Sequence, residues 1–165
     1  MTMIRKAKQR EITAILRIYE IARRYMRQNG NPTQWGDDYP SFAQIADDIA
    51  AEWLYVLCDD RDHPYGVFAF ILGEDPNYAQ IDGAWLNDRP YGTIHRVAGD
   101  GSQKGVFSQS LEFCEKICPN IRIDTHLHNT TMRHLLKKNG FIPCGMVNLE
   151  GRDGDGLRIA YQKEG

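Results

Sequence analysis

The polar side chains that could carry chemistry lie in two short stretches of the sequence. The first stretch, TIHRVA, contains His95 and runs into the glycine-rich segment GDGSQKGV. The second, IRIDTHLHN, places Asp124 five residues before Asn129. An unperturbed imidazole already titrates near neutral pH, so His95 is a candidate general base. A carboxylate that acts as a direct base needs desolvation or a water relay, and Asp124 is a candidate on that condition.

Both candidate bases also have structural interpretations. Asp124 could be a strand carboxylate that pairs with Arg122 or Arg96. His95 could simply hydrogen-bond to a neighbouring strand or loop. The residue types alone leave these alternatives open.

The glycine-rich segment, Gly99 to Val106, carries three glycines and a serine ahead of a helix start. The unpaired amides and partial positive charge of a helix N-terminus can hold a phosphate or pyrophosphate there. The segment matches neither G-x-x-x-x-G-K-[ST] nor G-x-G-x-x-G, so an ordinary solvated loop is an equal alternative. No magnesium ligands accompany it, which disfavours phosphoryl transfer.

A strand-turn-helix unit positions the second stretch. Apolar and polar residues alternate from Ile121 to Thr125, as in a half-buried strand, and Asn129 stands where its side chain can cap a helix. Gly140 ends that helix as a left-handed cap. The apolar face between these two caps consists of Met132, Leu135 and Leu136.

The remaining elements follow from hydrophobic periodicity and from turn residues. In chain order we expect a strand at Met3 to Ala7, helices from Ile12 to Arg27 and from Phe42 to Ala51, strands at Trp53 to Cys58, Gly66 to Leu72 and Thr93 to Ala98, a helix from Lys104 to Ile117, the strand-turn-helix unit, and strands at Phe141 to Leu149 and Leu157 to Tyr161 around the turn GRDGDG. The strand-helix-strand crossover predicts one parallel pair in a mixed α/β (α+β) fold.

Length and composition predict one domain over residues 1–165 that makes no contact with nucleic acid or membrane. The formal net charge is −2, and the longest apolar run, VFAFIL, is too short to cross a bilayer. The basic first residues, MTMIRKAKQR, are not followed by an apolar segment. The four cysteines lack paired metal-ligand spacing, and His126 and His128 lack a third ligand, so no metal is expected. We therefore expect a cytoplasmic protein with free thiols.

The two stretches together resemble the acyl-CoA-binding motifs of the GNAT family of N-acetyltransferases. NTTMRHLLKKNGF, Asn129 to Phe141, is similar to the second motif, in which an asparagine opens a helix that ends in a lysine, glycine, phenylalanine run. HRVAGDGSQKGV, at the right distance upstream, looks like the first motif, whose glycine-rich loop holds the coenzyme pyrophosphate. The order of elements from Ile4 to Tyr161 also fits the family.

The resemblance implies a mostly antiparallel sheet of about seven strands with about four helices, and acyl-CoA in a V-shaped opening between the fourth and fifth strands. It assigns the pantetheine arm to the backbone of Val97 and Ala98 and to the side chain of Asn129. It assigns Asp124 to the position at which some members place a carboxylate base. The pyrophosphate would be bound by the loop residues Ser102, Gln103, Lys104, Gly105 and Val106.

Three positions depart from the family pattern. Glutamine or arginine is usual where Ser102 stands, and glycine or alanine is usual where Phe107 stands, so phosphate binding could be weaker or differently shaped. Many members carry a tyrosine at the position of Leu136 to protonate the leaving thiolate, and leucine cannot donate a proton. That role must be absent here or filled elsewhere.

The resemblance therefore predicts an N-acetyltransferase that uses acetyl-CoA and a primary amine of a small molecule or peptide in a ternary complex. The alternative is a CoA-binding or regulatory module that has lost catalysis. The acceptor is not specified, and a homodimer stays open. Residues that could surround the acceptor are the aromatic Trp35, Tyr39, Trp85 and Tyr91 and the acidic Asp37, Asp38 and Asp88.

Overall fold

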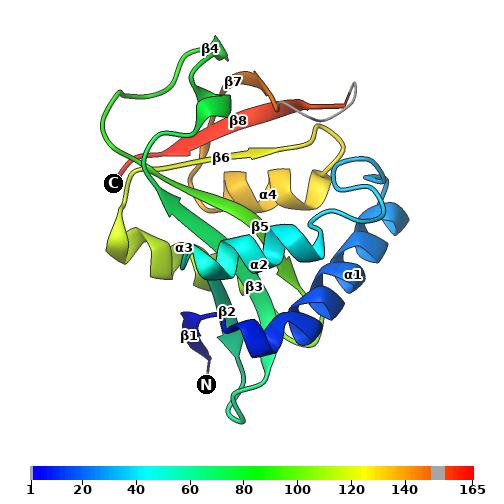
Figure 1. Cartoon of the computed structure of the whole chain (residues 1–165). Helices are drawn as coiled ribbons and strands as arrows, with labels where there is room; N and C mark the ends of the chain where they lie inside the picture. Colours follow the sequence, from blue (N-terminus) through cyan, green and yellow to red (C-terminus); the bar gives the residue numbers. More distant parts are fainter. Residues whose placement is uncertain (1, 150–154) are drawn as a thin grey trace.

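The computed structural model describes residues 2–149 and 155–165, in which one twisted sheet lies between two layers of helices (Figure 1). The helices are α1 (Ile12–Gln28), α2 (Phe42–Ala50), α3 (Val106–Ile117) and α4 (Thr130–Lys138), with 3₁₀ turns η1 (Gln9–Glu11) and η2 (Pro76–Tyr78). The strands are β1 (Met3–Lys6), β2 (Leu54–Cys58), β3 (Pro64–Leu72), β4 (Asp82–Gly83), β5 (Gly92–Gly99), β6 (Ile121–Thr125), β7 (Ile142–Asn148) and β8 (Leu157–Lys163).

The eight strands are ordered β1-β2-β3-β5-β6-β8-β7-β4, and within the described residues β5 and β6 form the one parallel pair. The predicted mixed fold, its four helices and its single parallel crossover are therefore confirmed. The short strand β4 and both 3₁₀ turns were not predicted, because two or three residues carry no readable periodicity. Helix α3 begins at Val106 rather than at Lys104. Most of the predicted turn GRDGDG lies outside the described residues.

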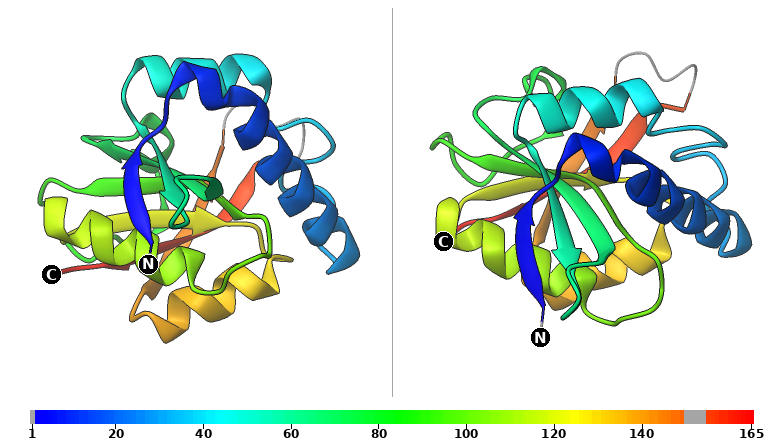
Figure 2. Two further views of the ribbon diagram at one scale, coloured as in Figure 1. Left: turned by 90° about the horizontal axis from the view of Figure 1, so that it is seen from below. Right: turned by 60° about the horizontal axis from the view of Figure 1, so that its bottom comes forward.

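Two apolar clusters attach the helices to opposite faces of the sheet. Helices α1 and α2 cover one face, where Ile15, Tyr19 and Ile45 are buried against β2 and β3. Helices α3 and α4 cover the other face, where Leu111 and Leu136 are buried in a second cluster (Figure 2). None of the described helices has both the length and the apolar character needed to cross a bilayer. The four cysteines are free thiols, and two of them are buried.

Strands β5 and β6 separate soon after they begin. They are paired only at Gly92 with Ile121 and at Thr93 with Arg122, although both strands continue beyond these residues. On its other edge, against β3, strand β5 contains a bulge. Val67 of β3 pairs with Ala98 and Ala69 pairs with His95, so one residue of β3 spans two residues of β5. Arg96, inside the bulge, has a left-handed backbone with a φ of 51°. The sheet therefore opens beside a strand whose backbone is locally reshaped.

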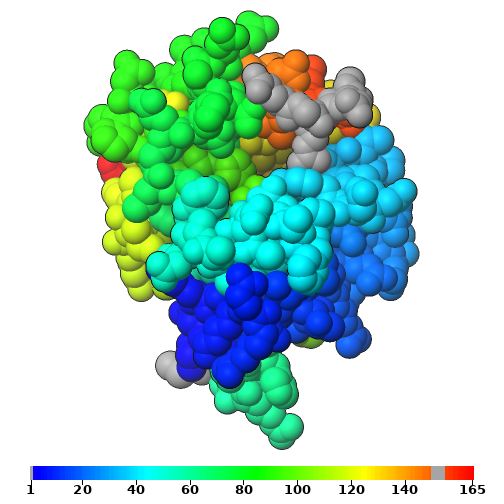
Figure 3. All heavy atoms as spheres, viewed as in Figure 1, coloured from blue at the N-terminus to red at the C-terminus, as the bar shows by residue number. Residues whose placement is uncertain are grey.

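The long connection from residue 73 to residue 91 covers part of the sheet next to this opening. Tyr78 and Tyr91 pack with Val147 and Ala160 in a third, smaller apolar cluster. In the space-filling view this connection and helix α2 lie on the same face, with part of the central sheet between them (Figure 3). The connection is therefore placed to contribute side chains to the opening.

Candidate active site

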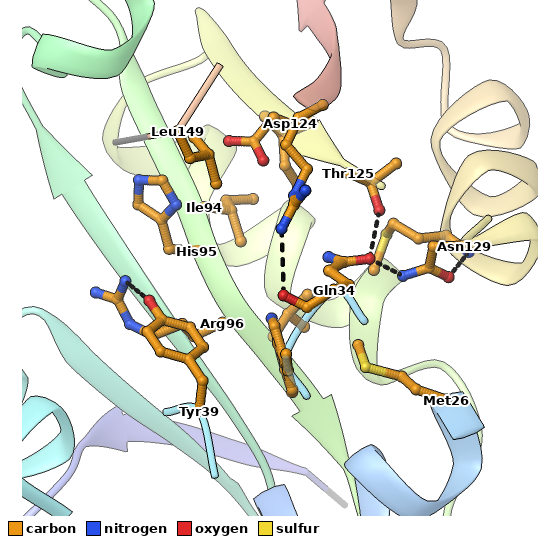
Figure 4. Close-up of a pocket in the computed structure, with 15 residues that line it drawn as sticks. Met26, Gln34, Tyr39, Ile94, His95, Arg96, Asp124, Thr125, Asn129 and Leu149 are labelled. Atoms are coloured by element: carbon orange, nitrogen blue, oxygen red, sulfur yellow. Dashed lines mark hydrogen bonds between the residues drawn. The ribbon is translucent and has the colours of Figure 1, made fainter. Parts of the chain in front are cut away.

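The opening between β5 and β6 contains a pocket whose lining comes from both strands, from the start of α4 and from the α1–α2 loop. Figure 4 shows His95 and Arg96 of β5 on one side, Asp124 and Thr125 of β6 on the other, and Asn129 beyond them. The two predicted bases, which are 29 positions apart in the sequence, thus line one pocket. Their partners come from residues that the sequence did not single out.

His95 forms a pair with Asp75, which immediately precedes η2. Its Nε2 lies 3.0 Å from Asp75 Oδ2, and the two side chains are 20% and 15% exposed. Asp75 also accepts a hydrogen bond from the backbone amide of Asn77 at 2.9 Å. Burial opposes the charge of Asp75, but the hydrogen bonds from His95 and Asn77 outweigh burial and lower the pKa of the carboxyl group. Asp75 is therefore a stable anion beside the imidazole.

Asp124 has Tyr78 as its partner. The buried Tyr78 hydroxyl donates to Asp124 Oδ2 at 2.5 Å. Burial, together with the nearby Asp124 charge, raises the pKa of Tyr78 well above its ordinary value, so the phenol keeps its proton. The structural alternative for Asp124 was wrong in detail, because the contacts place Arg96 and Arg122 elsewhere.

Arg96 belongs to a buried ion pair that joins the β5 bulge to α2. Its Nε and Nη2 atoms donate to the two carboxylate oxygens of Asp48 at 2.8 and 3.0 Å, and Nη1 donates to Tyr39 at 3.1 Å. The Tyr19 hydroxyl donates to the Arg96 carbonyl oxygen at 2.7 Å. These contacts hold the left-handed residue of the bulge from both its side chain and its backbone.

Arg122 points away from Asp124 into the connection 73–91. Its guanidinium carbon lies 4.2 Å from the Trp85 ring centre and 4.0 Å from the Tyr91 ring centre. Its Nη2 donates to the Asn87 carbonyl oxygen at 2.8 Å. Trp85 and Tyr91 therefore stack on an arginine and line a separate hollow with Asp88, not the pocket between the strands.

The predicted phosphate loop is exposed, and it ends at the N-terminus of α3. Gly105 caps this helix with a φ of 79°, a left-handed conformation that glycine adopts without strain. Ser102 is engaged locally, since its amide and hydroxyl both donate to Asp100 Oδ1 at 2.8 and 2.6 Å. The first-turn amides of α3, starting at Val106, have no partner within the helix. They could meet an anion, whereas Ser102 would first have to leave Asp100.

Of the other predicted coenzyme residues, Val97 and Asn129 line the pocket and Ala98 does not. Val97 lines it within the bulge, and Ala98 is paired with Val67 of β3. Asn129 is the N-cap of α4, as predicted, because its Oδ1 accepts from the Met132 amide at 3.0 Å. Its Nδ2 donates to Gln34 Oε1 at 3.1 Å, so a pantetheine carbonyl would have to replace Gln34 as its partner.

Gln34 links the α1–α2 loop to the end of β6. Its Oε1 atom also accepts from Thr125 Oγ1 at 3.4 Å (Figure 4). The same atom accepts from the His126 amide at 3.3 Å. Its carbonyl oxygen accepts from the buried Arg158 at 3.2 Å. Sequence reasoning missed Gln34, and no local pattern marks it.

The acceptor candidates of the α1–α2 loop divide into two groups. Trp35 and Tyr39 line the pocket, as an acceptor wall would require. Asp37 lies 3.5 Å from Arg27 on the surface, and Asp38 is exposed. The loop therefore brings aromatic rather than acidic side chains to the pocket.

The remaining chemistry-bearing residues are used structurally. Leu136, at the usual tyrosine position, is fully buried in the α3–α4 cluster. His126 pairs with Asp155 at 2.9 Å, and its Nδ1 accepts from the His128 amide at 3.0 Å. Among the described residues, no group of three or more His, Cys, Asp or Glu side chains could hold a metal ion.

Sequence reasoning also missed Asp75, Tyr78 and Asp48, which are the hydrogen-bond partners of the pocket residues His95, Asp124 and Arg96. Asp75 and Tyr78 lie in the segment DPNY, which reads only as a turn. Asp48 lies within α2, and its charged side chain gives no indication in the sequence that it is buried. The one available signal was the aromatic content of the connection that holds Tyr78.

Comparison with known proteins identifies the fold and the family. No family model matches the sequence, and no curated protein does. The crystal structure of a GNAT-family acetyltransferase from Streptococcus agalactiae is 33% identical, with 99% of this chain and 95% of that chain covered and a TM-score of 0.84. A proposed acetyltransferase from Staphylococcus aureus Mu50 is 25% identical over 98% of each chain, with a TM-score of 0.72.

A more distant structure shares the fold alone. A chain of the NatC complex bound to Gag peptide and CoA is 13% identical, with coverage of 99% and 98% and a TM-score of 0.64. The 33% identity to the streptococcal protein along nearly the whole length decides the family. This chain belongs to the GNAT family of acetyltransferases.

Proposed function

We propose that this protein transfers the acetyl group of acetyl-CoA to a primary amine of a small molecule or peptide, by direct attack in a ternary complex. The separation of β5 from β6 after only two paired positions carries the proposal. It leaves a pocket that is lined by β5 as far as Val97 and that reaches Asn129 at the start of α4, and β5 continues from Val97 to the exposed loop before α3. Family membership supports acetyl transfer as the reaction.

The coenzyme would run along this opening. The pyrophosphate would meet the loop from Ser102 to Val106, where helix amides and Lys104 supply positive potential. The pantetheine arm would follow the backbone of Val97 and Ala98, and Asn129 would bind it from the β6 side. The thioester would then lie between His95 and Asp124, which are the two candidate bases.

A second candidate function is a CoA-binding or regulatory module without catalysis. Leu136 supports it, because this fully buried side chain replaces the usual acid and cannot donate a proton. The hydrogen bond from Ser102 to Asp100 and the large, buried side chain of Phe107 also distinguish the loop from the family pattern.

Two measurements separate these functions. Calorimetry with acetyl-CoA, with CoA and with ADP as a pyrophosphate probe tests binding, and the proposal expects both CoA forms to bind more tightly than ADP. Turnover is then measured by mass spectrometry of the acetylated amine, because the four free cysteines would interfere with thiol-reactive reagents. The panel contains polyamines, aminoglycosides, amino acids and peptide N-termini.

Each outcome has a defined consequence. Acetylation of any of these amines supports the transferase. Tight acetyl-CoA binding without turnover of any amine supports the regulatory module. Absence of binding at concentrations well above those of a cell would overturn both.

A further inference from the structure

Two hydrogen-bonded pairs each contribute one side chain to the lining of the pocket, and one short segment supplies the other member of each pair. Asp75 pairs with His95 of β5, and Tyr78 pairs with Asp124 of β6. The Tyr78 ring also lies beside the imidazole, with 6.4 Å between ring centres. The segment around η2 therefore contacts both predicted bases, but in chemically different ways.

The contact with Asp75 defines the tautomer of His95. A carboxylate that remains charged can only accept a hydrogen bond, so Nε2 of the imidazole must be the donor. In the neutral ring Nδ1 then carries the lone pair. Nδ1 has no hydrogen-bond partner within the described part of the chain, and His95 lines the pocket. The ring is therefore held with its basic atom unoccupied and with an anion placed to stabilise the imidazolium.

The contact with Tyr78 has a different consequence for Asp124. The Tyr78 hydroxyl donates to one of the two carboxylate oxygens. It occupies Oδ2 and leaves Oδ1 for a ligand. Because the phenol is buried and keeps its proton, this donor persists at neutral pH. Asp124 is thus held in place by Tyr78 with one carboxylate oxygen available to bind a cation in the pocket.

Two arginines lie near His95. Arg96 is neutralised by Asp48, whereas Arg158, which lines the pocket, keeps its charge and donates to backbone carbonyl oxygens. Tyr39 accepts from Arg96, as described above. The two negative charges of Asp75 and Asp124 outweigh the single positive charge of Arg158 and favour an acceptor that enters as a cation.

We propose that His95 is the general base through Nδ1, that Asp75 is its positioning residue, and that Asp124, held by Tyr78, binds the ammonium group of an aliphatic primary amine. This inference rests on the proposed function and specifies its acceptor class. His95 removes one proton from the bound ammonium group, and the neutral nitrogen attacks the thioester carbonyl carbon. The carbon–nitrogen bond forms, the carbon–sulfur bond breaks, the thiolate gains one proton and one proton is released to solvent.

The tautomer is tested in the protein without ligands. Long-range proton–nitrogen NMR spectra distinguish protonated from unprotonated ring nitrogens, and the signals of His95 are identified by their loss in His95→Gln. We expect Nε2 to be protonated and Nδ1 unprotonated at pH 8. The Asp75→Asn variant, whose side chain can still accept from the Asn77 amide, should move the imidazole titration to lower pH. Protonation of Nδ1 in the wild type would overturn the assignment.

The base is tested by the pH dependence of kcat/KM. His95→Gln should lower kcat/KM by on the order of 10²- to 10⁴-fold. It should also remove the acidic limb of the profile, which is the fall in kcat/KM as the pH decreases and the base becomes protonated. Asp75→Asn should lower kcat and move that limb to lower pH, a change that a purely structural role would not produce. Glu74→Gln is the matched control, because it removes an exposed neighbouring charge without touching His95, and its limb should stay in place.

The ammonium site is tested by KM and by acceptor choice. Tyr78→Phe should raise the KM of the amine by roughly fivefold with an unchanged acidic limb, which corresponds to one lost hydrogen bond. Asp124→Asn should raise that KM further and reduce the preference for alkylamines over weakly basic arylamines. If the acidic limb changes in Asp124→Asn and stays unchanged in both His95→Gln and Asp75→Asn, then Asp124 is the base and the inference is overturned.

Failure of this inference can be distinguished from failure of the proposed function. If acetyl-CoA does not bind the wild-type protein, the proposed function fails and the base assignment fails with it, whatever the tautomer. If acetyl-CoA binds and amines are acetylated, but substitution of Asp75 or His95 leaves the pH profile unchanged, only the inference fails.

Discussion

At the scale of single residues, Asn129 combines a role in folding with a proposed role in binding. Its Oδ1 atom caps α4, while its Nδ2 atom faces Gln34 at the pocket. The two atoms can be separated chemically, because aspartate retains a capping oxygen and lacks the amide donor. The helix N-terminus would also favour the aspartate charge.

Asn129→Asp and Asn129→Ala are therefore expected to differ. Asn129→Ala should lose about 1 kcal/mol of unfolding free energy together with acetyl-CoA affinity, because both the cap and the donor are removed. Asn129→Asp should keep its stability and lose affinity alone. Urea unfolding and calorimetry measure the two quantities. Equal acetyl-CoA affinity of wild type and Asn129→Asp would restrict Asn129 to its capping role.

At the scale of secondary-structure elements, the pocket depends on contacts that hold the β5 bulge against α1 and α2. The ion pair between Arg96 and Asp48 is nearly buried, with side chains 11% and 1% exposed. Burial opposes the charge of Arg96, but Tyr39 and Asp48 outweigh it and raise its pKa. Such a pair adds little net stability, yet removing one partner leaves an uncompensated buried charge.

Asp48→Ala should accordingly destabilise the protein by about 3–5 kcal/mol. Glu20→Ala is the control, since its pair with Arg24 is exposed and contributes only about 0.5 kcal/mol or less. Urea unfolding measures both losses. The double variant Asp48→Ala/Arg96→Met should recover part of the loss, because it removes the unpaired charge. A loss below about 1 kcal/mol for Asp48→Ala would mean that water solvates Arg96.

At the scale of the whole molecule, ionisable groups limit stability at both ends of the pH range. The hydrogen bond from Arg5 lowers the pKa of Glu11 below its ordinary value of 4.5. The contribution of Glu11 is present above that value and is lost as the pH falls through the lowered folded pKa. Burial raises the pKa of Tyr19 and of Tyr78 above their ordinary 10.0. Their contribution is complete below pH 10 and is lost as the pH rises further.

We therefore expect the urea midpoint to fall below about pH 4.5 and above about pH 10. Glu11→Gln should cost about 1–2 kcal/mol at pH 7, and this difference from wild type should shrink at acid pH. Tyr19→Phe should lose about 1 kcal/mol at neutral pH and should decline less steeply at alkaline pH. Parallel pH profiles for the wild type and both variants would contradict these assignments.

The order of elements was predictable because periodicity, caps and turn residues are local signals. The Asn129 cap and the strand from Ile121 to Thr125 are confirmed in place for this reason. The partners of the candidate bases were not predictable. Tyr78 and Asp124 are 46 positions apart, and Gln34 and Asn129 are 95 apart. Nothing in a short window reports such a pairing.

The sequence by itself thus determined the longer elements and the crossover through apolar spacing, and through family resemblance it indicated the stretches that are proposed to form the coenzyme cleft. Only the tertiary structure decided what each reactive side chain contacts. Asp75 is hydrogen-bonded to His95, and Tyr78 is hydrogen-bonded to Asp124. Arg96 and Arg122, the partners considered for Asp124, contact Asp48 and Trp85 instead. The physical reason is that proton affinity depends on burial and on partners within a few ångströms, which the packing of distant segments supplies.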